Sequence, residues 1–153
     1  MKTTTPIVAV KSAPVAILNI AGLRLLLPQH DLRTVESASD VDDSEPEPYS
    51  VGWIKYQQKR WPTYCLSDDL ALLSHMPPTC RACVLMAVGD GYIGIMSDDV
   101  IIMRKTPERQ YELPAAMKMP ETPIKFLLSL DDAIVCVTEA QLLFQHINRM
   151  RTS

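Results

Sequence analysis

Residues 51–73, VGWIKYQQKRWPTYCLSDDLALL, decide the fold of this chain. β-branched and aromatic residues come in two runs, 51–56 and 61–66, which is typical of two strands. The polar residues 57–60 separate these runs and predict the end of a hairpin. Pro62 has no N–H to donate to a sheet ladder, so we expect its strand at a sheet edge or at a bulge. The stretch contains no catalytic constellation and is typical of a displayed surface.

The end of the same stretch predicts a short helix. Ser67 is a plausible N-cap, and the two aspartates that follow it fall in the first turn, where the helix dipole favours negative charge. Three leucines among residues 70–73 supply an apolar face. We expect a second short helix near the C-terminus, where Thr138 is the predicted cap and residues 142, 143 and 147 lie on or near one face.

Hairpins are also predicted on both sides of this stretch. Residues 16–28 form two apolar runs around Ala21-Gly22, and residues 83–100 contain the clearest turn, Val88-Gly89-Asp90-Gly91. A last hairpin, 124–137, turns at Asp131-Asp132. Between the first two hairpins, Leu32 and Val35 are expected to face the same way in a short strand or turn.

The order of these elements repeats loosely, with an offset of about 70 residues. Two similar half-chains of short strands suggest two small barrels packed on each other. Each barrel alone would be marginally stable, so the interface between them should be apolar. We therefore predict a mainly β protein with approximate subdomains 15–78 and 79–148, with segments free to cross between them.

Two segments are expected to lie outside the barrels. Residues 1–14 predict a loose N-terminal arm with a short strand at 7–10. Residues 36–48, ESASDVDDSEPEP, are too acidic and too poor in apolar residues to order themselves, which predicts a solvated acidic loop. A divalent-metal loop and an acidic partner contact are the alternatives. The nearby basic residues Lys55, Lys59 and Arg60 predict a contact with an acidic partner or with the chain's own acidic loop, and less readily with phosphate.

Composition narrows the classes of function. The chain has 153 residues and a net charge of -3, which gives no field for nucleic acid. No apolar run approaches the roughly 20 residues of a membrane span, so direct membrane insertion is not expected. The start of the chain does not predict a signal peptide, because prolines and a lysine break its apolar stretch. Four cysteines in a chain of this size are typical of reduced thiols in the cytoplasm.

Motifs for catalysis or cofactors are weak. Cys80 and Cys83 form a C-x-x-C, but a zinc ribbon needs a second pair and a redox site needs the pair to open a helix. A small-ligand or metal-binding regulatory domain using these two cysteines is the alternative function. The aspartate pairs 98–99 and 131–132 are expected at turns, where aspartate bonds locally. No nucleophile motif occurs, so the sequence predicts neither an enzyme nor a cofactor.

Three segments carry a resemblance to a known family. LLLPQHDLRTV, at 25–35, is similar to an apolar strand followed by V-x-E-V. GWIKYQQKRWPTYCL, at 52–66, is similar without a gap to G-V-x-N-L-R-G-x-x-V-P-V-x-D-L. IGIMSDDV, at 93–100, is similar to V-G-x-x-V-D-x-V. On these segments the chain resembles the CheW family, the coupling proteins of bacterial chemosensory arrays, over residues 15–147.

The resemblance implies a fold of two small five-stranded, SH3-like β-barrels around a common apolar interface. It implies a non-catalytic adaptor without a cofactor. The implied partners are the regulatory domain of a CheA-like histidine kinase and the cytoplasmic tip of a chemoreceptor, a methyl-accepting protein, bound in a groove between the subdomains. The contact residues carried over by the resemblance are Leu32, Thr34, Gly52, Ile54, Gln57, Gln58 and Gly94.

The chain departs from the family at an ion pair. The family arginine and the glycine after it are Gln57 and Gln58 here, and the family glutamate is Thr34. Both halves of the pair are replaced together, as expected when loss of one partner would strand a charge. The resemblance therefore implies a divergent adaptor, with an accessory role such as one in a type IV pilus or twitching pathway.

Overall fold

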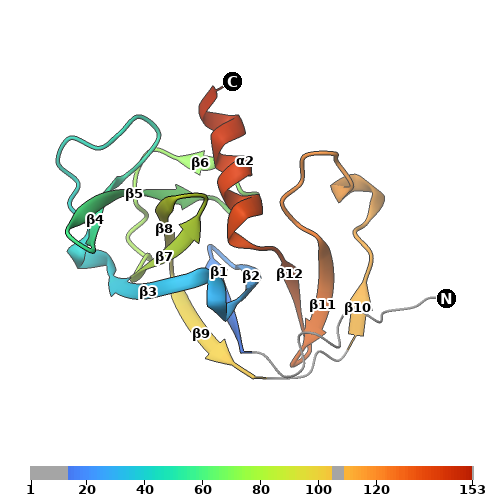
Figure 1. The fold of residues 1–153 in the computed structure, drawn as a ribbon. Coiled ribbons are helices and arrows are strands. Elements are labelled where there is room, and N and C mark those ends of the chain that lie inside the picture. The colour runs from blue at the N-terminus through green and yellow to red at the C-terminus, as the bar shows by residue number, and fades with distance from the viewer. Residues whose placement is uncertain (1–13, 105–108, 153) are drawn as a thin grey trace.

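The computed structural model describes residues 14–104 and 109–152. The predicted strand at 7–10, and all of the arm except Pro14, lie outside the described residues. The described chain is mainly β, with two curled sheets and one α-helix, α2 (Ala140–Thr152). The predicted fold class, mainly β with two subdomains, is confirmed at this level (Figure 1).

Each sheet takes strands from both halves of the chain. Sheet 1 has the order β10 (Arg109–Tyr111), β11 (Phe126–Leu130), β12 (Ala133–Val137), β2 (Leu23–Pro28), β1 (Val15–Ile20), β9 (Asp99–Met103). Sheet 2 has the order β3 (Leu32–Ser37), β7 (Ala82–Val88), β8 (Gly91–Ser97), β5 (Lys59–Leu66), β4 (Gly52–Tyr56), and β6 (Leu72–Leu73) pairs with β5. Figure 1 shows sheet 2 on the left and β10–β12 of sheet 1 on the right. Segments 15–78 and 79–148 therefore each contribute strands to both sheets. The outer limits of the domain stay a prediction.

The predicted hairpins are confirmed as β1–β2, β4–β5, β7–β8 and β11–β12, all antiparallel. Two-residue turns must match the right-handed twist of the strands, and this requires positive φ angles. Ala21 and Gly22 have φ angles of 53° and 92°, and Gly89 has 51°. Asp131 and Asp132 turn with φ angles of 52° and 62°, which aspartate tolerates better than most residues.

The core is divided into three clusters by the alternation of side chains along the strands. On β1, Ala16 and Leu18 face a large cluster shared by both sheets, whereas Ile17 faces the interior of sheet 1. On β7, Val84 faces the shared cluster and Leu85 faces the interior of sheet 2. Strands buried on both faces read as nearly continuous apolar runs, which explains VAILNI, broken only by Asn19, and ACVLMAV.

Helix α2 lies between the two sheets and closes the shared cluster (Figure 1). Its residues Ala140, Leu143 and Ile147 are buried there, at the spacing that places side chains on one helical face. The predicted apolar interface is therefore present. No helix among the described residues is long and apolar enough to cross a membrane.

The prediction of a helix after Ser67 is wrong. Residues 67–71 form a tight loop in which the Ser67 N–H donates to the Ala71 carbonyl at 2.8 Å and the Ala71 N–H donates to Ser67 Oγ at 3.0 Å. Leu70 adopts a φ of 65°, and β6 then pairs back on Cys65 and Leu66. So short a segment, followed closely by two prolines, cannot nucleate a stable helix, and the serine side chain bonds the loop backbone instead.

The start of α2 is predicted to within two residues, but its cap is not Thr138. Thr138 is buried and donates to the Pro123 carbonyl at 2.7 Å. The cap comes from Asp31, whose Oδ2 accepts the Ala140 N–H at 2.9 Å although the two residues are 109 positions apart. Asp31 ends a 3₁₀ turn, Gln29–Asp31, which leads from sheet 1 into sheet 2.

The first part of the acidic segment 36–48 is ordered, contrary to the prediction of a solvated loop. Its first two residues belong to β3, and the Ala38 N–H donates to the Arg81 carbonyl at 2.9 Å. Asp42 and Trp53 exchange two backbone hydrogen bonds of 2.8 Å. Val41 and Ala38 pack on the core of sheet 2, so two small apolar residues within the acidic run suffice to anchor it.

The Asp31 cap can be tested by substitution. We expect Asp31→Ala to lower the free energy of unfolding by about 0.5–2 kcal/mol, because the first N–H groups of α2 lose their acceptor. Thermal or urea unfolding measures the change. Glu139→Ala is the matched control, since the Glu139 side chain forms an exposed ion pair with Lys125 (3.2 Å) and its loss should change stability less. Equal losses in the two variants would contradict the assignment of the cap.

Candidate functional site

Three of the seven predicted contact residues are inside the sheet 2 barrel. Ile54 is only 3% exposed. Gly52 and Gly94 are buried where a side chain does not fit: a Cβ on Gly52 would lie 2.6 Å from the Asp42 carbonyl oxygen, and one on Gly94 would lie 2.5 Å from Thr63 Cγ2. These residues shape the barrel, and any part they have in binding acts through that shape.

Leu32 and Val35 face the same way, as predicted, and the reason is a β-bulge. The register of β3 on β7 shifts between Leu32 and Thr34, so Leu32 lies opposite Met86 and Val35 opposite Val84. Both opposite residues belong to the shared cluster. A bulge adds one residue and lets positions three apart share a face of the sheet.

The outer strand of sheet 1 contributes matching residues. On β9, Val100 lies opposite Leu18 and Ile102 opposite Ala16, and both of these β1 residues face the shared cluster. Leu32 and Val100 pack on the shared cluster, whereas Val35 and Ile102 are 47% and 45% exposed. We call these four residues, Leu32, Val35, Val100 and Ile102, the interdomain strip. Exposed apolar side chains on the outer strands of both sheets make these residues a candidate binding surface.

Thr34 points away from the interdomain strip. It lies opposite Leu85, which faces the sheet 2 interior, and its Oγ1 donates to Glu36 Oε2 at 2.6 Å. The hydroxyl of Thr34 is thus engaged within its own strand. Its role in partner binding stays a prediction.

Gln57 and Gln58 form the tip of the β4–β5 hairpin and are exposed. Their φ angles of 54° and 68° are costly for residues of this size, so the tip needs support from below. The support is aromatic: Tyr92 makes edge-to-face contacts with Tyr56 and Trp61, each with ring centroids 5.0 Å apart. The tip is therefore a fixed platform that displays two amide groups.

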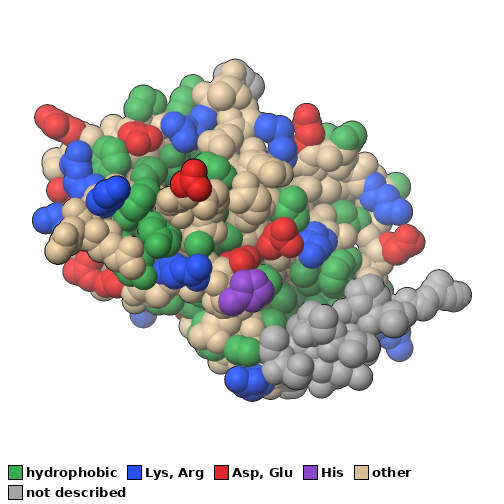
Figure 2. All heavy atoms as spheres, in the orientation of Figure 1, with side chains coloured by type: hydrophobic (Ala, Val, Ile, Leu, Met, Phe, Trp, Pro, Cys, Tyr) green, Lys and Arg blue, Asp and Glu red, His purple; other side chains and the backbone are tan. Residues whose placement is uncertain are grey.

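Opposite charges line a hollow of about 330 Å³ beside this hairpin. Glu36, Asp40 and Asp42 supply the acids, and Lys55 and Arg60 supply the bases. Acidic and basic side chains also alternate on the left of Figure 2, where Figure 1 places β4 and β5. Two of the three predicted basic residues, Lys55 and Arg60, thus share the hollow with the chain's own acidic segment, which is one of the alternatives that the sequence left open.

It was not predicted from the sequence that Glu36 and Arg60 line the same hollow. The family glutamate and arginine align with Thr34 and Gln57, yet opposite charges meet in the hollow from positions two and three residues further on. Arg60 is also held 4.3 Å above the ring of Trp53 by a cation–π contact. The alternation of β3, which points Thr34 and Glu36 to one face, was the only signal in the sequence.

Asp42 is held in its charged form. Hydrogen bonds from the Ser44 hydroxyl (2.6 Å) and the Ser44 N–H (3.0 Å) lower the pKa of Asp42, and the positive charges of Arg60 and Lys55 lower it further. The folded state thus favours the carboxylate. Any stability this gives is present above the unfolded pKa and is lost as the pH falls through the folded pKa.

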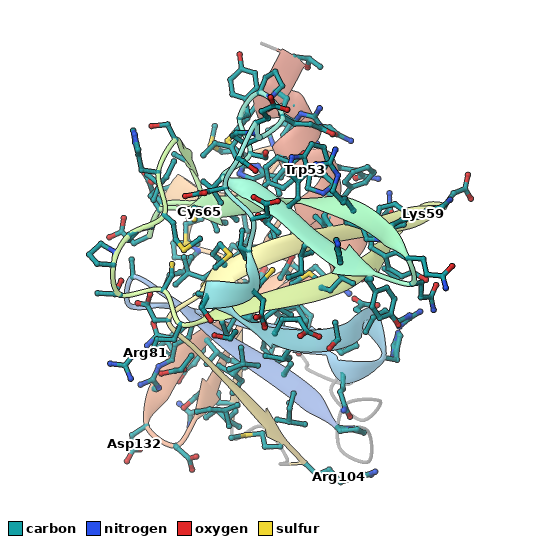
Figure 3. The ribbon with its side chains drawn as sticks, turned by 90° about the vertical axis from the view of Figure 1, so that its left-hand side faces the viewer. Trp53, Lys59, Cys65, Arg81, Arg104 and Asp132 are labelled. Carbon is teal, nitrogen blue, oxygen red and sulfur yellow. The ribbon has the colours of Figure 1, made fainter. Side chains whose placement is uncertain are left out.

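Cys80 and Cys83 do not form a ligand set. Cys83 is fully buried in the sheet 2 core, while Cys80 lies in the loop before β7. Burial raises the pKa of the Cys83 thiol to about 12 and also raises the pKa of Cys65 and Cys80 (Figure 3 labels Cys65). Within residues 14–104 and 109–152, no group of three or more His, Cys, Asp or Glu side chains could hold a metal ion.

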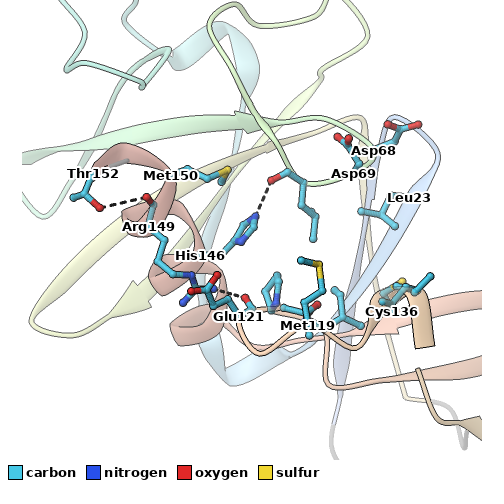
Figure 4. A pocket seen from close by; sticks show the side chains of 16 residues that line it. Leu23, Asp68, Asp69, Met119, Glu121, Cys136, His146, Arg149, Met150 and Thr152 are labelled. Atoms are coloured by element: carbon cyan, nitrogen blue, oxygen red, sulfur yellow. Dashed lines mark hydrogen bonds between the residues drawn. The ribbon is translucent and has the colours of Figure 1, made fainter. Parts of the chain in front are cut away.

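A second concave surface lies beside the C-terminal half of α2. This groove of about 870 Å³ is lined mainly by apolar side chains, among them Leu23, Met119, Cys136 and Met150 (Figure 4). Its polar groups are tied to the backbone, since His146 Nε2 lies 2.8 Å from the Leu70 carbonyl oxygen and Arg149 donates to the Glu121 carbonyl. The groove was not predicted from the sequence, because its residues come from five separated segments.

Comparison with known proteins supports the fold. No family model matches the chain, and no curated protein matches it. Among solved structures, the scaffolding protein TtCheW from Thermoanaerobacter tengcongensis is similar, with a TM-score of 0.65 and 14% sequence identity. The similarity covers 87% of this chain and 92% of that chain. The predicted CheW-like fold is therefore confirmed, and at this identity the comparison speaks for the fold alone.

The close approach at Gly94 gives a stability test. We expect Gly94→Ala to destabilise the protein by about 1–3 kcal/mol, because the new methyl group overlaps Thr63 and Cys83. Thr63→Ser removes the methyl group that lies 2.5 Å away, so adding it to Gly94→Ala should recover part of the loss. Urea unfolding of the two single variants and the double variant measures the coupling. Strictly additive losses would contradict this packing.

The cause of the Asp42 shift can also be tested. NMR titration should find the pKa of Asp42 below the usual range for aspartate. Ser44→Ala removes the hydroxyl donor and should raise the pKa more than Lys55→Ala does, because the Ser44 hydrogen bond is the larger cause. If Lys55→Ala raised the pKa of Asp42 more than Ser44→Ala did, the lowered pKa would come mainly from the nearby positive charges instead.

Proposed function

We propose that this protein is a non-catalytic adaptor in a bacterial chemosensory pathway. The observation that carries the proposal is the combination of a CheW-like fold with an exposed apolar strip on the outer strands of both barrels. The neighbour with this fold is a scaffolding protein. An adaptor needs surfaces rather than a reaction centre, and the strip is such a surface.

The interdomain strip fits the helical tip of a chemoreceptor. Its exposed side chains, Val35 and Ile102, are β-branched and stiff, so burying them loses little rotamer entropy. Full burial of such a side chain contributes about 1.5–3 kcal/mol, so two half-exposed ones contribute about half of that each. An amphipathic helix with apolar residues at a spacing of three and four is the kind of partner that covers such side chains.

The hairpin tip and the charged hollow fit the second partner, the regulatory domain of a CheA-like kinase. The hollow already contains both signs of charge, and the tip offers the amides of Gln57 and Gln58. Amides recognise polar groups without demanding a charge opposite them, whereas an arginine selects a carboxylate. We infer a partner surface that differs from one matched to arginine, in keeping with an accessory cytoplasmic adaptor, for example in a type IV pilus or twitching pathway.

The alternative function, a metal or small-ligand domain using Cys80 and Cys83, has weaker support. Raised thiol pKa values disfavour the thiolate that binds metal or attacks a disulfide. Cys80 packs against the same sheet 2 cluster that buries Cys83, and no group of three metal-binding side chains occurs among the described residues. Nucleic acid and membrane insertion are not part of the proposal.

Substitution of the strip tests the adaptor role. We expect Val35→Glu combined with Ile102→Glu to weaken binding to a purified chemoreceptor tip at least about tenfold, because each change places a charge in an apolar contact. Isothermal titration calorimetry with the receptor tip and the kinase regulatory domain of the same organism measures both partners. Kinase-domain binding should be retained, since it uses the other surface.

Ile134→Glu is the matched control, because Ile134 is 53% exposed but lies on β12, away from the strip. It should leave both affinities unchanged. Failure of the unmodified protein to bind either partner would overturn the proposal. An equal loss of receptor affinity in the strip variant and in the control would show that the interdomain strip is not the binding surface.

A further inference from the structure

In the described chain the two sheets have four outer strands, and three of them are protected against pairing. β3 carries a bulge between Leu32 and Thr34, which disturbs its ladder. β4 is covered at one end by the bridge between Asp42 and Trp53. β10 has only three residues. Bulges, covers and shortness are the devices by which proteins prevent edge strands from pairing with other chains.

β9 has none of these protections. It pairs with β1 in an unbroken register over all five of its residues, from Asp99 to Met103. Within residues 14–104 and 109–152 it is the end of sheet 1, so its other side has no strand partner there. Its central residues Ile101 and Ile102 are 49% and 45% exposed. A regular, apolar edge strand is a template for pairing with another strand.

The charges at the two ends of β9 indicate which strand fits. Asp98 and Asp99 lie at its start and Arg104 follows its end, where Figure 3 shows the strand running out to the rim of the molecule. A second copy of β9, laid antiparallel, brings the acidic end of each strand to the basic end of the other. The edge is therefore complementary in charge to itself.

We propose that two copies of this protein pair through β9 and join their six-stranded sheets into one. A continuous antiparallel sheet places the two-fold axis perpendicular to the sheet, so opposite residues must point to the same face. Pairing centred on Ile101 satisfies this: Ile101 lies opposite its own copy, Val100 lies opposite Ile102, and Asp98 lies opposite Arg104. Such an interface is isologous and closes at two subunits.

The dimer goes beyond the proposed adaptor role. Val100 and Ile102 belong both to β9 and to the interdomain strip, so pairing places a second copy directly beside the sheet 1 side of the strip. The dimer itself requires only the edge strand, and it stands whether or not an adaptor partner exists.

Sedimentation equilibrium of the full chain tests the proposal. We expect a concentration-dependent monomer–dimer equilibrium for the natural protein and a monomer for Ile101→Lys, because a lysine on an edge strand blocks pairing. Ile134→Lys, at a similarly exposed isoleucine on β12, should keep the dimer. Circular dichroism checks that each variant is folded. A natural chain that stays monomeric up to millimolar concentration, or equal dimerisation of Ile101→Lys and the natural chain, would overturn the proposal.

Charge reversal tests the antiparallel arrangement separately. Asp98→Lys and Arg104→Glu should each weaken self-association by about tenfold, since each places like charges opposite one another at both ends of the interface. Because Asp98 also accepts the Ala21 N–H at 3.2 Å, the stability of its variant is measured alongside. An equimolar mixture of the two variants should form a heterodimer, because the introduced lysine of one copy then meets the introduced glutamate of the other. A mixture that associates no better than the separate variants would contradict this pairing of the strands.

Discussion

The apolar core shared by the two sheets is the constraint on which the other features of this structure depend. β1 and β7 are buried on both faces, one against their own barrel and one against the shared cluster. Each sheet has an apolar face outside its own barrel that would be unfavourable in water. The two sheets bury these faces against each other. Helix α2 completes the arrangement by inserting Leu143 and Ile147 into the same cluster.

The path of the chain reinforces this dependence. Sheet 1 is built from residues near the start of the chain and from residues after Ser97, and sheet 2 is built from those between them. The chain therefore completes sheet 1 only after it has formed sheet 2. The hydrogen bond between Asp31 and Ala140 links the first connection between the two sheets to helix α2. Contacts of such long sequence separation link the two barrels and are expected to slow folding.

The local features of this fold were predictable from sequence, and the errors arise from tertiary contacts. Gly89, Asp131 and Asp132 mark turns whose φ angles the residues themselves allow, so the hairpins follow from the pattern. The helix expected after Ser67 failed because β5 offered its segment a strand partner. Likewise, Glu36 and Arg60 meet in one hollow only because the sheet brings β3 and the β4–β5 hairpin together.

The same two-faced burial that stabilises the barrels also accounts for the exposed apolar residues. A strand at the end of a sheet still carries apolar residues on the face that borders the shared cluster, but the outermost of them have no neighbour to cover them. Leu32 and Val100 reach the cluster, whereas Val35 and Ile102, beyond them, remain half exposed. The proposed binding surface is therefore a direct consequence of the way the core is shared, and substitutions that leave the core intact can change the surface freely. This separation is in keeping with a CheW-like fold at only 14% identity to a solved structure.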